Sequence, residues 1–235
     1  MPDPSSSAST SAASRVIFFI DGQNLYHGCQ AHFGHGNTHP DLLAAEFLEG
    51  RALAGIRFYT GLASPQLDPK GNARMQRRLS AMRERGVYTW SHQLKYSQKR
   101  VIKKHSRPCP CGCWEIVEIM QGREKGIDLR IALDMIRMAR HSEYDIARLV
   151  SQDGDLEQVV REIRDLQTEL ALALRIENVI PFSASSGKPR IRVPGCARYH
   201  EIDNAMFARI RDNTDYSVAP GGNPPLQSTP GASNS

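Results

Sequence analysis

Aspartates that lie beside short apolar runs constrain the fold of this chain most. Asp21 directly follows the apolar run 16–20, and Asp153 follows the run 146–150. Short, continuously apolar runs are typical of strands that are buried on both faces of a parallel sheet. Side chains at the carboxyl ends of such strands face a ligand crevice. The pattern therefore predicts an α/β fold with acidic groups at one edge of its sheet.

Strand and helix patterns alternate along most of the chain. Strands are expected at residues 16–20, 56–62, 87–90, 146–150, 169–174 and 191–193. Helices are expected at residues 24–33, 41–48, 65–85, 127–139, 156–166 and 205–211. Short links between them predict a doubly wound, mostly parallel sheet. One domain at residues 14–212, with an insertion at about 92–122, accounts for a chain of 235 residues.

Both ends of the chain have a low-complexity composition. Residues 1–13 and 213–235 are rich in small and polar residues, and we expect both segments to be disordered. No apolar run approaches the roughly 20 residues of a membrane helix. The run 16–20 is too short for the core of a signal peptide. We therefore expect a cytoplasmic protein that does not enter a membrane.

Asp21 and Asp128 each have a structural alternative to a role in a site. Asp21 and the nearby Asn24 both fit the cap or turn that opens a helix. Asp128 fits a favourable interaction with a helix dipole in a first turn. We favour it over Asp134 on the same segment, because six helical residues rotate the second side chain by roughly 240°.

Two aspartates follow the run 146–150. Asp155 with Gln158 fits a capping box, so Asp153 is the stronger candidate for a site. Carboxylates gathered at one edge of a sheet repel one another unless protons or a hard cation neutralise them. Oxygen ligands are those that Mg²⁺ prefers. The acids therefore predict metal-assisted phosphoryl chemistry.

Three motifs together resemble the NYN domain, a family of the PIN-like nucleases. They are residues 20–26 (Ile-Asp-Gly-Gln-Asn-Leu-Tyr), residues 124–128 (Glu-Lys-Gly-Ile-Asp) with 132–135 (Ala-Leu-Asp-Met), and residues 150–156 (Val-Ser-Gln-Asp-Gly-Asp-Leu). The motifs occur in the order of the family and cover roughly residues 15–175. Gln152 and Leu156 depart from the family, in which glycine and phenylalanine are usual at these places.

The resemblance implies a three-layer α/β/α PIN-like (Rossmann-like) fold. It also implies an endoribonuclease that uses Mg²⁺ or Mn²⁺ to cut RNA, which we expect to be single-stranded. The matching acids, which would be catalytic and bind metal, are Asp21, Asp128 and Asp153, with Asp155 as a further metal ligand and Asn24 and Ser151 in support. No histidine occupies a position that suggests a general acid, so a metal-activated water would carry the reaction.

A basic segment precedes the second motif. Residues 95–107 contain six basic residues and no acid, with Trp90 and Tyr96 nearby. Basic residues among aromatic ones can hold phosphates and stack bases, and a solvated hairpin is the alternative. The expected RNA-binding residues are Lys95, Lys99, Arg100, Lys103, Lys104, Arg107 and Lys125. The helix at 65–85, with Arg74, Arg77 and Arg78 on its outer face, is a second candidate track.

Three cysteines, Cys109, Cys111 and Cys113, lie close together in the same segment. Structural Zn²⁺ sites use pairs of ligands with two to four residues between them. The spacing of a single residue favours free thiols in a surface hairpin over a Zn²⁺ site. A further ligand of such a site would come from His92, His105 or Cys29.

Other functions and partners fit the sequence to different degrees. A non-catalytic module with the same fold, which binds RNA or recruits a partner, is the main alternative, although buried acids do not help a protein bind a polyanion. A phosphatase of the haloacid dehalogenase type would need an aspartate where the chain has Gln23. The formal charge of +5 adds slight support for a polyanionic partner. A homo-oligomer or a complex with another protein is compatible with the sequence.

Overall fold

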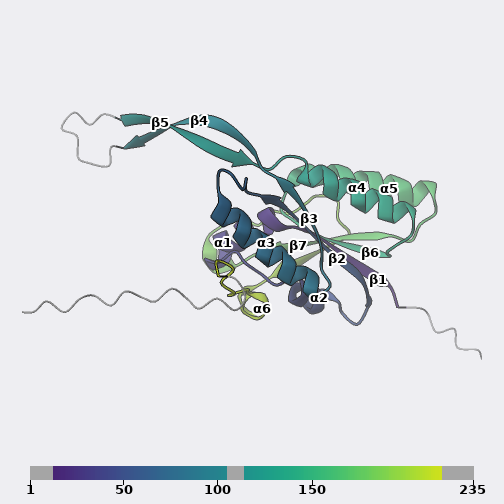
Figure 1. The fold of residues 1–235 in the computed structure, drawn as a ribbon. Coiled ribbons are helices and arrows are strands. Elements are labelled where there is room, and N and C mark those ends of the chain that lie inside the picture. Colours follow the sequence, from purple (N-terminus) through teal and green to yellow (C-terminus); the bar gives the residue numbers. More distant parts are fainter. Residues whose placement is uncertain (1–12, 105–113, 219–235) are drawn as a thin grey trace, which may run out of the picture.

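Strands and helices alternate along the chain in the computed structural model, which describes residues 13–104 and 114–218 (Figure 1). The strands are β1 (Arg15–Asp21), β2 (Ala52–Leu62), β3 (Tyr88–Gln93), β4 (Lys95–Lys104), β5 (Trp114–Arg123), β6 (Ile146–Val150), β7 (Arg175–Pro181) and β8 (Arg198–Ile202). The α-helices are α1 (Gly22–Phe33), α2 (Pro40–Phe47), α3 (Pro69–Glu84), α4 (Ile127–Arg140), α5 (Glu157–Glu169) and α6 (Asn204–Ile210). Two short 3-10 turns are η1 (Gly154–Leu156) and η2 (Ala184–Ser186).

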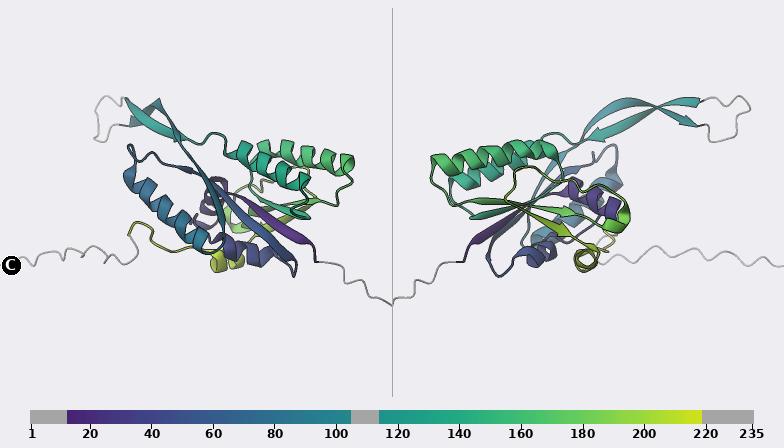
Figure 2. Two further views of the ribbon diagram at one scale, coloured as in Figure 1. Left: turned by 45° about the vertical axis from the view of Figure 1, so that its right-hand side comes forward. Right: turned by 180° about the vertical axis from the view of Figure 1, so that it is seen from behind.

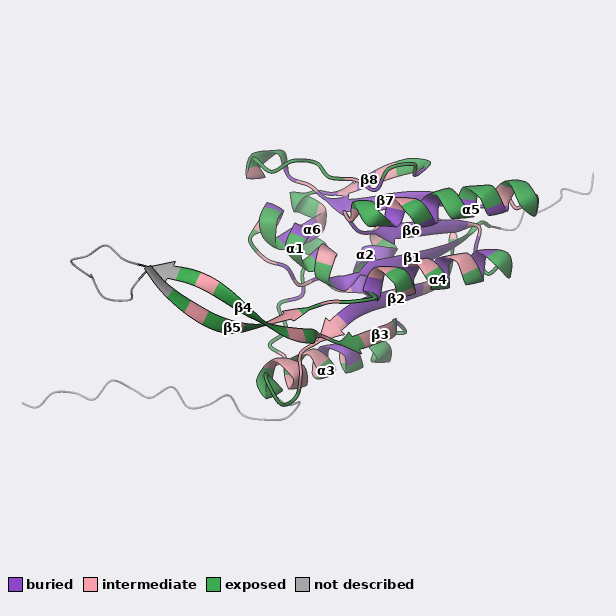
Figure 3. Ribbon diagram, turned by 90° about the horizontal axis from the view of Figure 1, so that it is seen from above, coloured by how far each residue is buried: buried purple, intermediate pink, exposed green. Residues whose placement is uncertain are grey.

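Six strands form a parallel sheet in the order β3-β2-β1-β6-β7-β8. Helices α4 and α5 cover one face, and α1, α2, α3 and α6 cover the other (Figure 3). The alternation of side chains along β1 explains the two layers: Val16, Phe18 and Ile20 belong to one apolar cluster, and Ile17 and Phe19 belong to the other. The expected three-layer α/β/α fold is confirmed.

The winding of the sheet reverses between β1 and β6, which are neighbours in its middle. Ile20 of β1 pairs with Val150 of β6. Open parallel sheets bind ligands outside the carboxyl ends of the strands at such a reversal. Asp21 ends β1, and the loop that carries Asp153 follows β6. The fold therefore places two of the expected site acids at this point.

The later strands differ from what the sequence led us to expect. The strand expected at 169–174 is wrong, because α5 ends at Glu169 and the next strand is β7. The edge strand expected at 191–193 is also wrong, since β8 takes that place in the sheet. β7 carries the polar residues Glu177 and Asn178 in its buried middle, which hides it from a search for apolar runs.

The buried polar groups of β7 have partners in the adjacent strands. Glu177 accepts hydrogen bonds from Arg148 of β6 at 3.0 Å and from His200 of β8 at 2.8 Å. Burial raises the pKa of Glu177, but the hydrogen bond from His200 and the charge of Arg148 outweigh it and lower the pKa to about 2. Asn178 donates to the carbonyls of Leu149 and Ser151, each at 2.9 Å. Buried polar groups that are paired in this way fix the register of the strands.

Strands β4 and β5 form an antiparallel hairpin, called the arm below, that projects from the sheet (Figure 2). The arm lies in the segment expected to be a basic insertion. Its base is tied to the end of β2: Ser64 N–H donates to the Tyr96 hydroxyl at 3.1 Å, and Leu94 N–H donates to the Leu62 carbonyl at 2.8 Å. An isolated two-stranded hairpin is at best marginally stable in water, so these contacts matter for its position.

Several expected features lie partly or wholly outside the residues that the structure describes. Arg107 and the cysteines of the considered Zn²⁺ site, Cys109, Cys111 and Cys113, lie outside the described residues. Of the segment 213–235, residues 213–218 are described. They lie against α3, where Arg77 donates to the carbonyls of Tyr216 at 2.6 Å and Ser217 at 2.9 Å. Within residues 13–104 and 114–218, no helix has the length and apolar character needed to cross a membrane.

Candidate functional site

A cavity of about 450 Å³ lies where the winding of the sheet reverses. Four carboxylates line it, those of Asp21, Glu124, Asp128 and Asp153. The other lining residues are Gln23, Asn24, His27, Gly122 and Arg123. The structure therefore brings Asp21, Asp128 and Asp153 together, although they lie far apart in the sequence.

Asp21 is both the last residue of β1 and the N-cap of α1. Its Oδ1 accepts a hydrogen bond from Asn24 N–H at 3.0 Å, and its Oδ2 accepts one from the Ser151 hydroxyl at 3.4 Å. Burial raises the pKa of Asp21 to about 6; the hydrogen bond from Asn24 N–H opposes the rise, and the nearby charges of Asp128 and Asp153 add to it. The cap and the acidic cavity thus share one carboxylate.

Asn24 and Ser151 hold the loop after β6 in place. Asn24 Oδ1 accepts a hydrogen bond from Gln152 N–H at 2.7 Å, which ties the loop to α1. The Ser151 hydroxyl accepts one from Asp153 N–H at 3.1 Å. Asp153 Oδ1 in turn accepts one from Asp155 N–H at 2.9 Å. These bonds position the Asp153 carboxylate relative to Asp21.

Asp155 lies beside the cavity and is exposed. The capping box considered for Asp155 and Gln158 is not formed, because α5 begins at Glu157 with Leu156 as its N-cap residue and without a side-chain cap. The charge of Asp155 is near enough to Asp128 to raise the pKa of that acid. Asp155 is therefore an outer neighbour of the four lining carboxylates.

Asp128 and Asp134 lie on different sides of α4. Asp128, in the first turn, is half-buried against the cavity, and burial followed by the charges of Asp153 and Asp155 raises its pKa. Asp134 is buried away from the cavity. It accepts hydrogen bonds from the Tyr59 hydroxyl at 2.9 Å and from Arg130 at 3.2 Å, and Arg57 lies 3.5 Å away. Asp134 therefore holds α4 against β2.

Glu124 is a lining acid that the sequence did not single out. Its Oε1 accepts a hydrogen bond from Gly61 N–H, and a Cβ at position 61 would lie only 2.5 Å from that oxygen. Burial raises the pKa of Glu124 to about 7; the Gly61 N–H opposes the rise, and the charges of Asp21 and Asp128 add to it. The available signal was the position of Glu124 at the start of the second motif, four residues before Asp128.

His27 also lines the cavity, although the sequence placed no histidine in a position that suggests a general acid. It lies on α1 three residues after Asn24 and four after Gln23, so the three side chains share one face of the helix. The spacing of His27 from Gln23 and Asn24 is the feature of the sequence that could have placed it beside the site. The exposed ring of His27 is therefore available to a ligand that enters the cavity.

The expected RNA-binding residues are mostly separate from the cavity. Lys95, Lys99 and Arg100 are exposed on the arm, and Arg100 forms an ion pair with Glu118 of β5 at 2.9 Å. Lys125 is exposed just after Glu124. The side chains of Lys103 and Lys104 lie outside the description. β5 leads from the arm directly to Arg123 and Glu124 at the cavity.

The donor atoms of the four lining carboxylates fit a hard divalent cation. Within the described part of the chain, no three Asp, Glu, His or Cys side chains are placed to hold one ion together. Mg²⁺ often binds through one or two carboxylates and keeps several waters, so it does not require such a cage. Burial is the main cause of the raised pKa values of Asp21, Glu124 and Asp128, and the charges of neighbouring acids add to it; a bound cation would favour the charged form of each carboxylate.

Comparisons with known proteins agree with this architecture. The family model of the NYN domain matches residues 15–186, from β1 to η2. The chain is also similar to the crystal structure of a protein of unknown function from Vibrio parahaemolyticus, with a TM-score of 0.51 and 18% identity over 83% of this chain and 96% of that chain. This second likeness shows the fold alone. No curated protein matches the chain.

Proposed function

Because this chain belongs to the NYN domain family, whose members are generally nucleases, we propose that it is a metal-dependent ribonuclease. It would hydrolyse phosphodiester bonds of single-stranded RNA. The observation that carries the proposal is the meeting of four carboxylates in one cavity at the reversal of the sheet. Acids in such a place gain from a bound cation, whereas a protein that only binds a polyanion gains nothing from them.

Asp21, Asp128 and Asp153 are the residues that would hold one or two Mg²⁺ or Mn²⁺ ions, each ion through one or two of these carboxylates and several waters, with Asp155 beside them. A bound divalent cation supplies a water of lowered pKa and offsets the charge that develops on the phosphate. Hydrogen bonds of Asn24 and Ser151 fix the position of Asp21 relative to the loop that carries Asp153. These two residues therefore position the acids.

Glu124 is placed to exchange a proton in this reaction. Gly61 N–H holds its Oε1, which leaves Oε2 to carry the proton. Burial raises the pKa of Glu124 to about 7 when no cation is bound, and a cation beside it would lower that pKa and favour the carboxylate, the form that accepts a proton. In the proposed reaction, Glu124 takes a proton from the attacking water.

The location of the protein in the cytoplasm stays a prediction.

The test is a cleavage assay on a mixed pool of single-stranded RNA. We expect fragments in the presence of Mg²⁺ or Mn²⁺ and intact RNA in excess EDTA. A purified, folded protein that binds the pool but leaves it intact with either metal would contradict the proposal. That result would favour the alternative of a non-catalytic RNA-binding module.

The arm is expected to bind phosphates without regard to sequence. Changing Lys99, Arg100, Lys103 and Lys104 to serine should weaken the binding of all single strands alike. Each lost phosphate contact removes about 0.7 from the slope of log affinity against log salt concentration. Binding in EDTA at several salt concentrations isolates this effect from cleavage. Arg140→Ser, an exposed change on α4, serves as the control, and an unchanged slope in the fourfold variant would return the arm to a solvated hairpin.

A further inference from the structure

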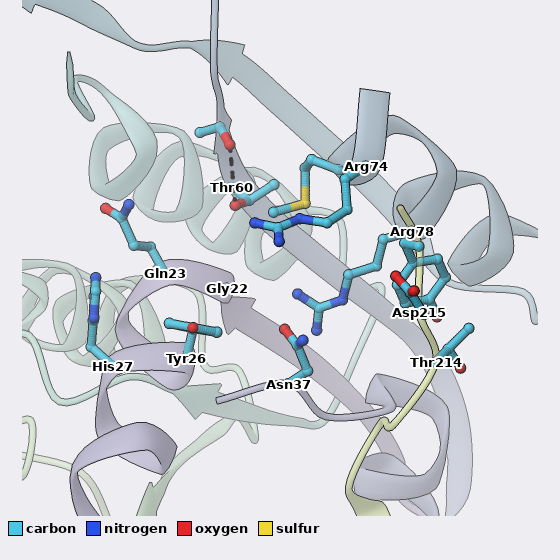
Figure 4. A pocket seen from close by; sticks show the side chains of 13 residues that line it. Gly22, Gln23, Tyr26, His27, Asn37, Thr60, Arg74, Arg78, Thr214 and Asp215 are labelled. Carbon is cyan, nitrogen blue, oxygen red and sulfur yellow. Dashed lines mark hydrogen bonds between the residues drawn. The ribbon is translucent and has the colours of Figure 1, made fainter. Parts of the chain in front are cut away.

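A second cavity, of about 390 Å³, lies between α1 and α3 (Figure 4). Gln23 and His27 line both this cavity and the acidic one, so the two adjoin along α1. Thr60 and Gly61, near the end of β2, also line the second cavity. A ligand that occupies it therefore lies next to the four carboxylates.

One wall of the second cavity is cationic. Arg74 and Arg78 of α3 both line it, and Figure 4 shows the two guanidinium groups extending into it. The expectation that Arg78 lies on the outer face of α3 is wrong, because Arg78 is only 6% exposed. Its Nη2 donates to the Thr38 carbonyl at 3.2 Å, while its Nε has no hydrogen-bond partner among the described residues. The carboxylate of Asp212 lies 3.9 Å from this Nε and offsets part of the charge of Arg78. The exposed guanidinium of Arg74 is therefore the better placed of the two to bind an anion, and arginine suits the geometry of phosphate.

The opposite wall offers an aromatic ring. Tyr26 of α1 lines the cavity and is 38% exposed. Gly36 packs against this ring so closely that a Cβ at position 36 would lie 2.4 Å from it. The backbone at Gly36 therefore packs against the Tyr26 ring and limits its movement. Aromatic rings beside cationic groups are the usual means of binding a single-stranded nucleotide, through stacking and phosphate contacts.

The third wall comes from the segment at residues 212–217, beyond the part of the chain that matches the family model. Thr214, Asp215 and Tyr216 line the cavity. The Tyr216 hydroxyl donates to Asp212 at 2.9 Å, and Arg77 binds the carbonyls of Tyr216 and Ser217. Asp215 is the one acid in the lining, and it accepts a hydrogen bond from Ser217 N–H at 2.8 Å. Asp212, which is paired with Arg78, is a second acid close to the cavity, so the charge open to a ligand is that of the exposed Arg74.

We infer that this cavity binds one nucleotide of the RNA strand, next to the phosphate that is cut. The phosphate of that nucleotide binds Arg74 and Arg78, and its base or sugar lies against Tyr26. The volume lies at the lower end of the range for small-molecule sites, about 300 to 1,000 Å³, so it suits one unpaired nucleotide and not a base pair. The inference rests on the proposed function, because the single-stranded RNA that it places in the cavity is the substrate of the proposed reaction.

The test measures binding in EDTA, where no metal-dependent cutting occurs. The ligands are uridine, uridine 5′-monophosphate and a fluorescent single-stranded RNA, each with the parent protein and the variants Arg74→Gln and Tyr26→Ala. We expect Arg74→Gln to weaken the binding of the monophosphate and the RNA about tenfold, and to leave the binding of uridine unchanged. Tyr26→Ala should weaken all three about tenfold.

Arg140→Gln on α4 removes the same charge from the other face of the sheet and is the control. An equal loss in Arg140→Gln, or parent affinity in both cavity variants, would overturn the inference. Tighter binding of the monophosphate than of the RNA would assign the cavity to a free nucleotide and would also overturn it. If the expected losses occur in a protein that never cuts RNA with metal, the cavity stands as a nucleotide site and the nuclease proposal fails alone.

Discussion

Asp21→Asn and Asp153→Asn are each expected to lower metal-dependent RNA cleavage by at least about a hundredfold and to leave the fold intact. Loss of groups that only orient metal ligands already reduces activity by about 10- to 100-fold, and a ligand itself should matter more. Asparagine caps a helix about as well as aspartate, so the α1 cap at Asp21 survives. Burial, with a smaller contribution from the charges of Asp128 and Asp153, raises the pKa of Asp21, so a neutral side chain avoids both the burial of a charge and the repulsion in the metal-free protein.

The measurements are the cleavage rate with saturating Mn²⁺ and the melting temperature in EDTA. The melting temperature of both variants should be no lower than that of the parent. Asp203→Asn is the matched control, because Asp203 caps α6 through Met206 N–H at 2.8 Å and does not line the acidic cavity. Reduced thermal stability with intact cleavage would assign Asp21 and Asp153 to capping and would contradict the nuclease proposal.

Asp128→Ala and Asp134→Ala are expected to separate activity from stability. Asp134→Ala leaves the Tyr59 hydroxyl and Arg57 without their buried partner, and we expect it to lower the free energy of unfolding by about 3 kcal/mol. The folded fraction should still cut RNA. Asp128→Ala removes an acid from a repulsive cluster, so it should keep the stability of the parent and lose cleavage.

Urea denaturation in EDTA gives the stability of both variants. The cleavage assay belongs at a temperature where both are folded. Each variant serves as the control for the other, since the two carboxylates lie six residues apart on one helix. Equal loss of cleavage from two folded variants would show that Asp134 also acts in the site, and the assignment of α4 would then be wrong.

The part of the fold around β1, β6 and α4 could be predicted because local patterns agree with the tertiary structure there. The runs 16–20 and 146–150 are apolar since both faces of these strands are buried, and the periodicity of α4 separates Asp128 from Asp134. β7 could not be found in this way. Its Glu177 and Asn178 are polar residues whose partners come from other strands, and only the assembled sheet supplies them.

Two parts of the site depend on contacts that no local pattern records. Glu124 reaches the acids because the arm returns to the end of β2, where Gly61 leaves room for its carboxylate. The second cavity needs the segment at residues 212–217 to lie against α3, which is far away in the sequence. Both features follow from long-range packing, so their residues look ordinary in the sequence.

The arm joins the rest of the chain at two points that lie side by side. Lys95 and Arg123 are paired at its base, so the chain leaves and returns at adjacent points. Changes of length between two such points alter loop entropy only slowly and leave the strands of the sheet where they are. The arm can therefore be exchanged or shortened as a unit while the acids of the cavity stay in place. Glu124 is the first residue after the arm. Any replacement of the arm must therefore end so that Glu124 can still accept the hydrogen bond from Gly61 N–H.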